Sequence, residues 1–219
     1  MEHIGKTLGR LSHQPSTQTP IPSDTSNECQ DGLSIARRLN VSSISHTFDN
    51  FKRVKGTEEM LDVMKLIAEG TDRKFVFLYG TVGCGKTYII ESLIIQWANK
   101  GIFTRYNTNS QLMRMFKNCM KPQSIPSYEE MFRRICQVDR LIIDDMGMGT
   151  AESTWELATL EDIINERYHM RYFPTPVITI MATNKDITEI PDRITSRFYD
   201  PEVGLVLCNR AQDYRKRKV

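Results

Sequence analysis

The sequence predicts a three-layer α/β domain built around a mainly parallel, five-stranded sheet. Apolar runs of strand length alternate with amphipathic runs of helical length. A glycine-rich loop joins the first of these strands to a helix. Three strands end in residues suited to polar chemistry, at Gly80, Asp144 and Asn184. Because ligands bind at the carboxyl ends of the strands in such sheets, we expect these three positions to share one site.

Length and composition agree with one domain of ordinary size. The 219 residues are 40% hydrophobic, which is enough for a sizeable core. The 29 basic and 27 acidic residues give a net charge of +2. This balance neither indicates nor excludes a nucleic-acid binder, because local patches decide binding.

The cysteines are scattered and show no Cys-x-x-Cys or Cys/His spacing. We expect reduced thiols rather than a disulfide framework or a zinc site. No apolar leader or membrane-length run stands in the sequence, so we expect a cytoplasmic protein without membrane contact. The cysteines are Cys29, Cys84, Cys119, Cys136 and Cys208.

The chain opens with a polar segment rich in Ser, Thr, Pro and Gln. Such a composition buries little, so residues 1–45 are predicted to form a largely disordered arm. A short helix at 28–41 is a candidate for binding a partner. Residues 46–219 are predicted to form the folded domain. At its start, Phe48 and Phe51 suggest a lip that packs on the core or on a nucleotide base, and a helix is expected at 58–69.

The strand at 75–79 runs into a G-x-x-x-x-G-K-T loop and then an amphipathic helix. This is the P-loop setting, in which successive N–H groups form a nest for phosphate oxygens. Lys86 is expected to reach the β- and γ-phosphates, and the Thr87 hydroxyl to ligate Mg²⁺. The predicted nucleotide-binding residues are Gly80, Thr81, Val82, Gly83, Cys84, Gly85, Lys86, Thr87 and Tyr88.

Next come a second strand at 103–107, a helix at 109–120 and a loop. Ser127 and Glu130 then have the spacing of a capping box, which opens a helix to about residue 138. A buried strand follows at 141–143 and ends in Asp144 and Asp145. We expect Asp144 to hold Mg²⁺, directly or through water, and Asp145 to orient or deprotonate the attacking water.

A long helix at 153–171 leads to a fourth strand at 177–182, tipped by Asn184. Asn184 would sense the γ-phosphate, or it would cap the next helix. Arg193 and Arg197 are four residues apart and would share a helical face. One interpretation is a surface ion pair with an acidic side chain. The other is that an arginine is supplied to a neighbour's γ-phosphate. A fifth strand at 203–208 and a basic end complete the chain.

The assembled motif series resembles the DnaC/IstB-like branch of AAA+ ATPases, the helicase loaders and transposon ATPase subunits. The resemblance covers about residues 44–219, and the motifs that carry it are TFDNF, GTVGCGKT, LIIDDMG, MATN, DRITSRF and DYRKRK. It implies an AAA+ P-loop NTPase fold whose C-terminal helical lid is absent or minimal. Arg215 matches only weakly the arginine that such a lid carries.

The resemblance also implies roles for single residues. Lys86 and Thr87 match the Walker A motif, Asp144 and Asp145 the Walker B motif, and Asn184 the sensor-1 position. Arg197 matches the arginine finger, and Arg193 accompanies it as a nucleotide-site arginine. The implied catalytic residues are therefore Lys86, Asp145, Asn184 and Arg197.

Members of the branch imply ATP and Mg²⁺ as cofactors and ATP hydrolysis at a subunit interface. They also imply a self-assembling oligomer, single-stranded DNA and a hexameric replicative helicase as partners. Candidate DNA contacts are Arg114, Phe116 and Lys117, although Phe116 would otherwise be core and the two cations solvated. The expected function is therefore helicase loading in DNA replication. A regulator of DNA transposition and a slow nucleotide-switched adaptor remain alternatives.

Overall fold

The computed structural model describes residues 32–70, 72–147, 154–172 and 177–217. Most of the predicted N-terminal arm, through residue 31, therefore lies outside the described residues. The division between arm and domain at residues 45 and 46 stays a prediction. The helices are α1 (Gly32–Leu39), α2 (Glu58–Glu69), α3 (Lys86–Asn99), α4 (Asn109–Cys119), α5 (Tyr128–Cys136), α6 (Thr154–His169) and α7 (Asp192–Thr195).

The strands form one sheet in the order β2-β3-β4-β1-β5, and every neighbouring pair is parallel. Their bounds are β1 (Phe75–Gly80), β2 (Arg105–Thr108), β3 (Arg140–Met146), β4 (Ile178–Thr183) and β5 (Gly204–Asn209). This is the predicted fold class. The order places β4 between β1 and β3, so Gly80, Asp144 and Asn184 meet at one edge of the sheet.

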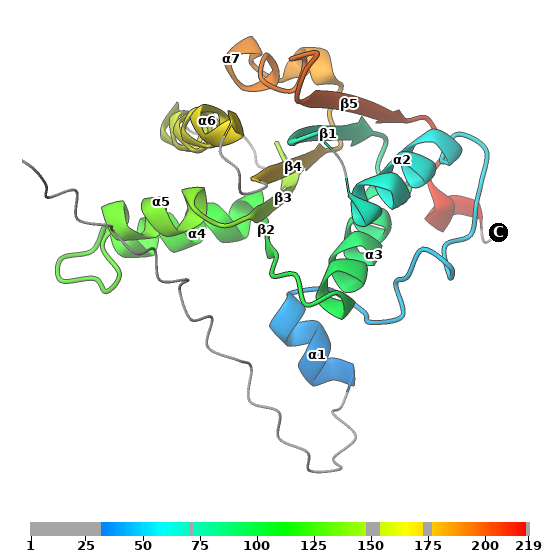
Figure 1. Ribbon diagram of the computed structural model, residues 1–219, viewed down its shortest axis with the longest axis horizontal. Helices are drawn as coiled ribbons and strands as arrows, with labels where there is room; N and C mark the ends of the chain where they lie inside the picture. Colours follow the sequence, from blue (N-terminus) through cyan, green and yellow to red (C-terminus); the bar gives the residue numbers. More distant parts are fainter. Residues whose placement is uncertain (1–31, 71, 148–153, 173–176, 218–219) are drawn as a thin grey trace, which may run out of the picture. The chain divides into compact units, whose positions relative to one another are not determined.

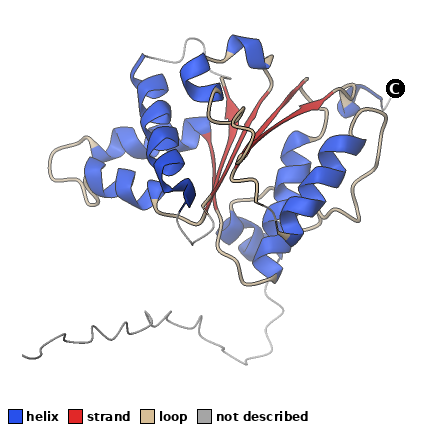
Figure 2. Ribbon diagram, turned by 45° about the horizontal axis from the view of Figure 1, so that its top comes forward, coloured by secondary structure: helices blue, strands red, loops and turns tan. Residues whose placement is uncertain are grey.

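Helices cover both faces of the sheet (Figures 1 and 2). Alternate residues of each strand point to opposite faces, so two separate apolar clusters form. One cluster packs α1, α2 and α3 on residues such as Val76 and Ile142. The other packs α4, α5, α6 and α7 on residues such as Phe77 and Ile143. Strands buried on both faces explain why the apolar runs of the sequence are nearly continuous.

Two local predictions differ from the structure. The second strand begins at Arg105 rather than at residue 103, because its pairing with β3 starts there, and Phe103 remains 70% exposed. The predicted helical face with Arg193 and Arg197 is also wrong. Helix α7 ends at Thr195, and a turn follows in which the Phe198 N–H donates to the Thr195 carbonyl. That turn lets Phe198 become fully buried, and it leaves Arg197 outside the helix.

A fully buried arginine joins three elements beneath the sheet. The Arg167 guanidinium of α6 donates to the carbonyls of Cys136 and Val138 at the end of α5, at 2.8 and 2.7 Å. It also donates to the Ile178 carbonyl of β4 at 2.8 Å. Burial lowers its pKa to about 10, so the side chain remains charged at neutral pH. Among the described helices, none is both long and apolar enough to cross a membrane.

Candidate active site

A cavity of about 710 Å³ opens at the carboxyl ends of β1, β3 and β4. Its volume is in the range of small-molecule sites. Five parts of the chain line it: the P-loop with the first turn of α3, the segment before α2, the end of β3, the end of β4 and the last described residues. The lining residues are His46, Asn50, Phe51, Lys52, Val54, Val82, Gly83, Cys84, Gly85, Lys86, Thr87, Tyr88, Asp145, Asn184, Tyr214 and Arg215.

The P-loop glycines have a second reason to be glycine, beyond the predicted room for phosphates. A Cβ at Gly80 would lie 2.2 Å from the Asn209 carbonyl oxygen, and one at Gly83 would lie 1.8 Å from Oδ1 of Asp213. Both glycines also have positive φ angles, of 146° and 72°. The chain itself therefore fills these spaces. Gly80 and Thr81 lie outside the cavity lining, and Thr81 donates its hydroxyl to the Ala211 carbonyl at 2.9 Å.

Lys86 provides a buried cation beneath the cavity. Its side chain is 5% exposed, and Nζ donates to the carbonyls of Gly80 and Thr81 at 2.8 and 3.0 Å. It also donates to Oδ1 of Asn184 at 2.6 Å. Within the described residues this ammonium forms hydrogen bonds to neutral oxygens and no ion pair. A buried charge without a counter-ion fits an anionic ligand such as a triphosphate.

Asp144 provides the opposite charge from β3, which β4 separates from β1. It is 1% exposed, and its Oδ2 accepts from the Thr87 hydroxyl at 2.8 Å and from the Tyr106 hydroxyl at 3.3 Å. Burial raises the pKa of Asp144, and burial also raises the pKa of Tyr106. In the described part of the chain the carboxylate has no cationic partner within ion-pair distance. Paired hydroxyl and carboxylate oxygens are ligands that Mg²⁺ accepts, so the two residues fit the predicted metal.

Asp145 and Asn184 connect these two charges. The Asn184 amide donates to Oδ1 of Asp145 at 3.3 Å and accepts from Lys86 with its other atom. Asp145 has a left-handed backbone, with φ of 55°, next to a register shift between β3 and β4. Such a conformation at the edge of a cavity is typical of a functional residue. The alternative of Asn184 as a helix cap is wrong, because Asp186 caps the next turn, Ile187–Glu189.

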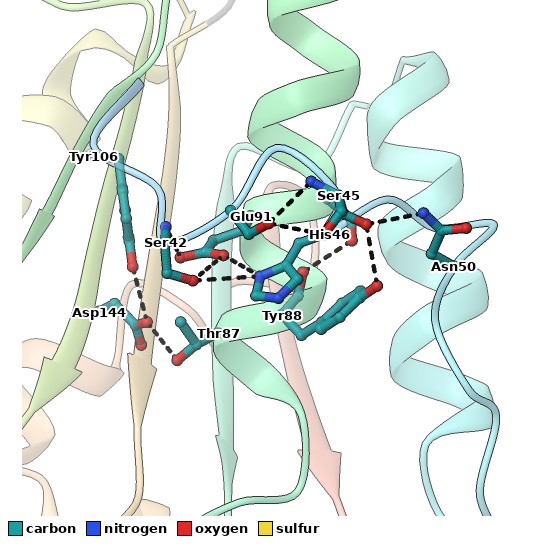
Figure 3. A network of polar contacts seen from close by, with 11 residues as sticks. Ser42, Ser45, His46, Asn50, Thr87, Tyr88, Glu91, Tyr106 and Asp144 are labelled. Atoms are coloured by element: carbon teal, nitrogen blue, oxygen red, sulfur yellow. Dashed lines mark hydrogen bonds and ion pairs between the residues drawn. The ribbon is translucent and has the colours of Figure 1, made fainter. Parts of the chain in front are cut away.

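Glu91 was not predicted, and it holds the segment that lines the other side of the cavity (Figure 3). It lies one turn after Thr87 in α3 and is 2% exposed. Its carboxylate accepts from the Ser42 N–H and from the Ser42 hydroxyl, each at 2.8 Å, and it pairs with Nδ1 of His46. A single buried carboxylate therefore ties residues 42–46 to the helix that follows the P-loop. The sequence gives no local motif for this contact, because the partners are 45 and 49 residues apart.

Three aromatic rings continue this wall of the cavity. The His46 ring lies 4.1 Å from the Tyr88 ring, and Phe51 meets Tyr88 edge-on at 5.3 Å. Phe51 is half-buried and lines the cavity, whereas Phe48 is only 8% exposed and belongs to the core. The core alternative is confirmed for Phe48, whereas Phe51 both packs against the core and lines the cavity, so packing of Phe51 on a base stays a prediction. The rings give the cavity an apolar wall of the kind that a nucleotide base requires.

The last described residues are hydrogen-bonded to the P-loop. No pattern in the sequence predicts this contact. The Tyr214 N–H donates to the Gly83 carbonyl at 2.9 Å, and Nδ2 of Asn209 donates to the Cys84 carbonyl at 2.9 Å. Tyr214 and Arg215 then line the cavity, next to Gly83. The P-loop is consequently held from the β5 side as well as from α3.

The two predicted arginines are absent from the described cavity lining of their own chain. Arg193 pairs with Glu161 of α6 at 3.1 Å, which matches the surface ion pair weighed above. Arg197 donates to the Ser196 hydroxyl at 3.0 Å and lies 5.1 Å from the centre of the Tyr168 ring. Neither arginine therefore contributes to the cavity of its own chain as described.

The three predicted DNA contacts divide in the structure. Phe116 is fully buried among the apolar residues beneath the sheet, so the prediction that it stacks on a base is wrong. Its position on the apolar face of α4 explains the burial. Lys117 pairs with Glu156 at 2.7 Å and lies over the Trp155 ring. Arg114 is exposed and lines a different hollow, at the edge of the sheet.

Comparison with known families supplies an independent result. A profile of the Bacterial DnaA ATPase domain matches residues 43–207. The chain is 29% identical over 178 residues to the chromosomal replication initiator protein DnaA of Cereibacter sphaeroides, covering 78% of the chain and 36% of that protein. It is 29% identical over 193 residues to DnaA of Rickettsia massiliae, covering 83% of the chain and 40% of that protein. The chain thus spans well under half the length of these relatives.

Solved structures share the fold. The AMPPCP-bound DnaA of Aquifex aeolicus aligns with a TM-score of 0.63 at 20% identity, over 78% of this chain and 52% of that one. The DnaC helicase loader aligns with a TM-score of 0.59 at 18% identity, over 74% of this chain and 96% of that one. DnaI aligns with a TM-score of 0.62 at 17% identity, over 78% and 93%. At these identities the likeness extends to the α/β fold alone.

Proposed function

We propose that this chain, which belongs to the family of bacterial DnaA ATPase domains by the profile match over residues 43–207, acts as an AAA+ ATPase. From this membership we propose that it binds ATP with Mg²⁺ in the cavity at the ends of β1, β3 and β4. The observation that carries the proposal is the arrangement of opposite, separately buried charges. Lys86 is a cation and Asp144 an anion without ion-pair partners in the described residues, and Asn184 and Asp145 lie between them.

The chain's residues divide the work of hydrolysis. Lys86 exchanges its contacts with the Gly80 and Thr81 carbonyls for the β- and γ-phosphate oxygens. Thr87 and Asp144 would hold Mg²⁺, which would supply positive charge to neutralise those phosphates. Asp145 and Asn184 accept and donate hydrogen bonds that fix a water in line with the γ-phosphorus. The segment held by Glu91 and the ring of Phe51 surround the base.

A second copy of the chain would complete this site with Arg197 and Arg193, which explains why both lie away from their own cavity. Arg197 is absent from the described cavity lining of its own chain, and its guanidinium rests on Tyr168. An arginine that reaches the γ-phosphate of a neighbour contributes about 10³–10⁵ in rate where such a device operates. We therefore assign Arg197 to the site of an adjacent subunit in an ATP-dependent oligomer, with Arg193 beside it.

For the cellular role we propose assembly on single-stranded DNA during replication and delivery of a hexameric helicase. DnaA supports the replication role as the sequence relative, and one neighbouring structure is described as replication initiator DnaA bound to AMPPCP and single-stranded DNA. The DnaC helicase loader, a neighbour in fold, supports helicase delivery. Arg114, exposed on α4, is the predicted DNA contact that retains a suitable position.

The test is the mass of the assembly measured by light scattering. The full chain is mixed with a non-hydrolysable ATP analogue, a single-stranded oligonucleotide and the host's replicative helicase, in every combination. We expect a defined oligomer with the analogue and a larger complex that contains the helicase. Lys86→Ala serves as the control that fails to bind nucleotide and stays small. The assembly's mass could instead increase on addition of DNA and stay the same on addition of helicase. That result would favour DNA coating, as expected of a transposition regulator, over helicase loading.

A further inference from the structure

A second hollow, of about 430 Å³, lies at the β2 edge of the sheet. It spans all three layers: α1 comes from one face, α4 from the other, and the edge strand β2 runs between them (Figure 1). The only charged side chains among its described lining residues belong to Arg37, Arg38, Arg105 and Arg114. Four cations therefore surround a space to which the described lining contributes no carboxylate.

The positive charges in this hollow are not neutralised by the rest of the described chain. None of the four arginines has an ion-pair partner among the described residues. Arg105 is half-buried, and its partners are neutral: the Asn107 side-chain oxygen at 3.0 Å and the Met115 sulfur at 3.3 Å. Burial lowers the pKa of Arg105, which indicates that the guanidinium has lost water without gaining a counter-ion. An anionic ligand would supply that counter-ion.

The hollow also has an aromatic rim. Phe103 stands just before β2, lines the hollow and is 70% exposed. The edge of the strand itself is covered, because Nδ2 of Asn40 donates to the Tyr106 carbonyl at 2.9 Å. An added β-strand would need that carbonyl, so the exposed surface favours side-chain recognition instead. Arginines beside an exposed aromatic ring form the surface that holds phosphates and stacks on unpaired bases.

We propose that this hollow binds the backbone of single-stranded nucleic acid, with the four guanidinium groups on phosphates and the Phe103 ring against a base. The inference deepens the DNA-binding part of the proposed function and rests on it. It adds α1, whose Arg37 and Arg38 precede residues 43–207, the part of the chain that matches the family. The site thus combines the shared domain, through Arg105 and Arg114, with a helix outside the matched region.

Strand β2 connects the hollow to the proposed nucleotide site. Arg105 faces the hollow, and the next residue, Tyr106, places its hydroxyl 3.3 Å from Oδ2 of Asp144. Asn40, at the end of α1, is bonded to β2, and Ser42 two residues later is held by Glu91. Contacts made in the hollow are therefore adjacent to groups of the ATP site.

Fluorescence anisotropy with a labelled oligothymidylate tests the proposal. The full chain is measured with an ATP analogue at several salt concentrations. We expect Arg37→Ala/Arg38→Ala to raise the Kd about tenfold or more and to flatten the slope of log Kd against log salt by about 1.4, since each lost phosphate contact contributes about 0.7. Phe103→Ala is expected to raise the Kd about tenfold and to leave the salt slope unchanged.

Arg53→Ala is the matched control, because it removes an exposed arginine that pairs with Asp62 away from the hollow. Binding of a fluorescent ATP analogue, measured in parallel, reports whether each variant is folded. An unchanged Kd and salt slope in Arg37→Ala/Arg38→Ala would overturn the site while leaving DNA binding elsewhere intact. Loss of affinity equal in the arginine variant and in Arg53→Ala would do the same. A third outcome is that Arg37→Ala/Arg38→Ala weakens binding, Phe103→Ala does not, and polyglutamate displaces the oligonucleotide. That outcome would assign the hollow to an acidic protein segment instead.

If the wild-type chain binds the ATP analogue but no oligonucleotide, this inference fails together with the DNA part of the proposed function. ATP binding and hydrolysis would then stand on their own measurements.

Discussion

Glu91 shows how one buried side chain can shape a cavity that it does not line. It is absent from the lining, yet its carboxylate fixes Ser42 and His46, and His46 stacks on Tyr88 at the cavity wall. Hydrogen bonds to a charged acceptor contribute about 1.5–3 kcal/mol each in such settings. The same carboxylate carries two of them from Ser42 as well as the contact with His46.

We predict that Glu91→Gln weakens ATP binding about tenfold, because the neutral amide cannot accept all three contacts and the segment beside the base loosens. Inorganic tripolyphosphate, which has no base, should bind as it does to the wild type. The measurement is competition of each ligand against a fluorescent ATP analogue.

Glu69→Gln is the matched control, since Glu69 makes an exposed pair with Lys100 at 2.8 Å. Such pairs contribute about 0–1 kcal/mol, so this variant should bind both ligands normally. Equal weakening of ATP and tripolyphosphate by Glu91→Gln would show that the residue supports the P-loop in general rather than the base side.

At the residue scale, the sequence predicts functional side chains where they belong to a local motif. Lys86, Thr87 and Asp144 are of this kind, since spacing within one loop or at one strand end identifies each residue, although their contacts span 98 and 57 residues. The roles assigned to them stay predictions until measured. Glu91 and Asp213 belong to no such motif, so only the folded structure reveals their contacts with Ser42 and the P-loop. Phe116 was misassigned for a related reason: an aromatic ring on an amphipathic helix has the same sequence pattern in a core as on a platform.

At the scale of elements, Arg167 adds hydrogen bonds to the apolar packing among α5, α6 and β4. It links the end of α5 to β4 from its position in α6, and its side chain is fully buried. The α5 carbonyls of Ile135 and Cys136 lie at the helix end, where intrahelical donors run out. The guanidinium therefore acts as a buried cap.

We predict that Arg167→Ala destabilises the fold by about 3–5 kcal/mol, because the carbonyls that it binds are left buried without donors. Urea unfolding followed by circular dichroism measures the change. Arg134→Ala, which removes an exposed partner of Glu130 within α5, should change the free energy of unfolding by less than about 0.5 kcal/mol. A loss for Arg167→Ala no greater than that of Arg134→Ala would contradict the capping account.

Most elements follow from periodicity, because buried parallel strands and amphipathic helices leave distinct patterns. Helix α2 has the predicted bounds, and the other strands agree within one or two residues at their ends. The start of β2 and the length of α7 could not be predicted in this way. The start of an edge strand depends on its pairing partner, here Leu141 opposite Arg105. The end of the short helix α7 depends on tertiary packing, because the following turn buries Phe198.

At the scale of the whole molecule, the parallel order β2-β3-β4-β1-β5 assembles the ATP site, and the same sheet leaves Arg197 away from its own cavity. An arginine that completes a neighbour's site has to be presented on another face of the domain, so that identical subunits assemble head to tail. The sequence supplied the arginine and its motif. It could not supply the geometry, which depends on the turn after α7 and on the Tyr168 ring that supports the guanidinium.

The most direct test of this account is subunit complementation between Asp145→Asn and Arg197→Ala. Each variant alone should bind ATP, assemble, and hydrolyse at least about 10³-fold more slowly than the wild type, because every interface lacks one group. An equal mixture should recover about a quarter of the wild-type rate when subunits combine at random, since that share of interfaces holds both an intact Asp145 and a neighbour's Arg197. A mixture that co-assembles by light scattering but hydrolyses no faster than either variant alone would contradict the shared site.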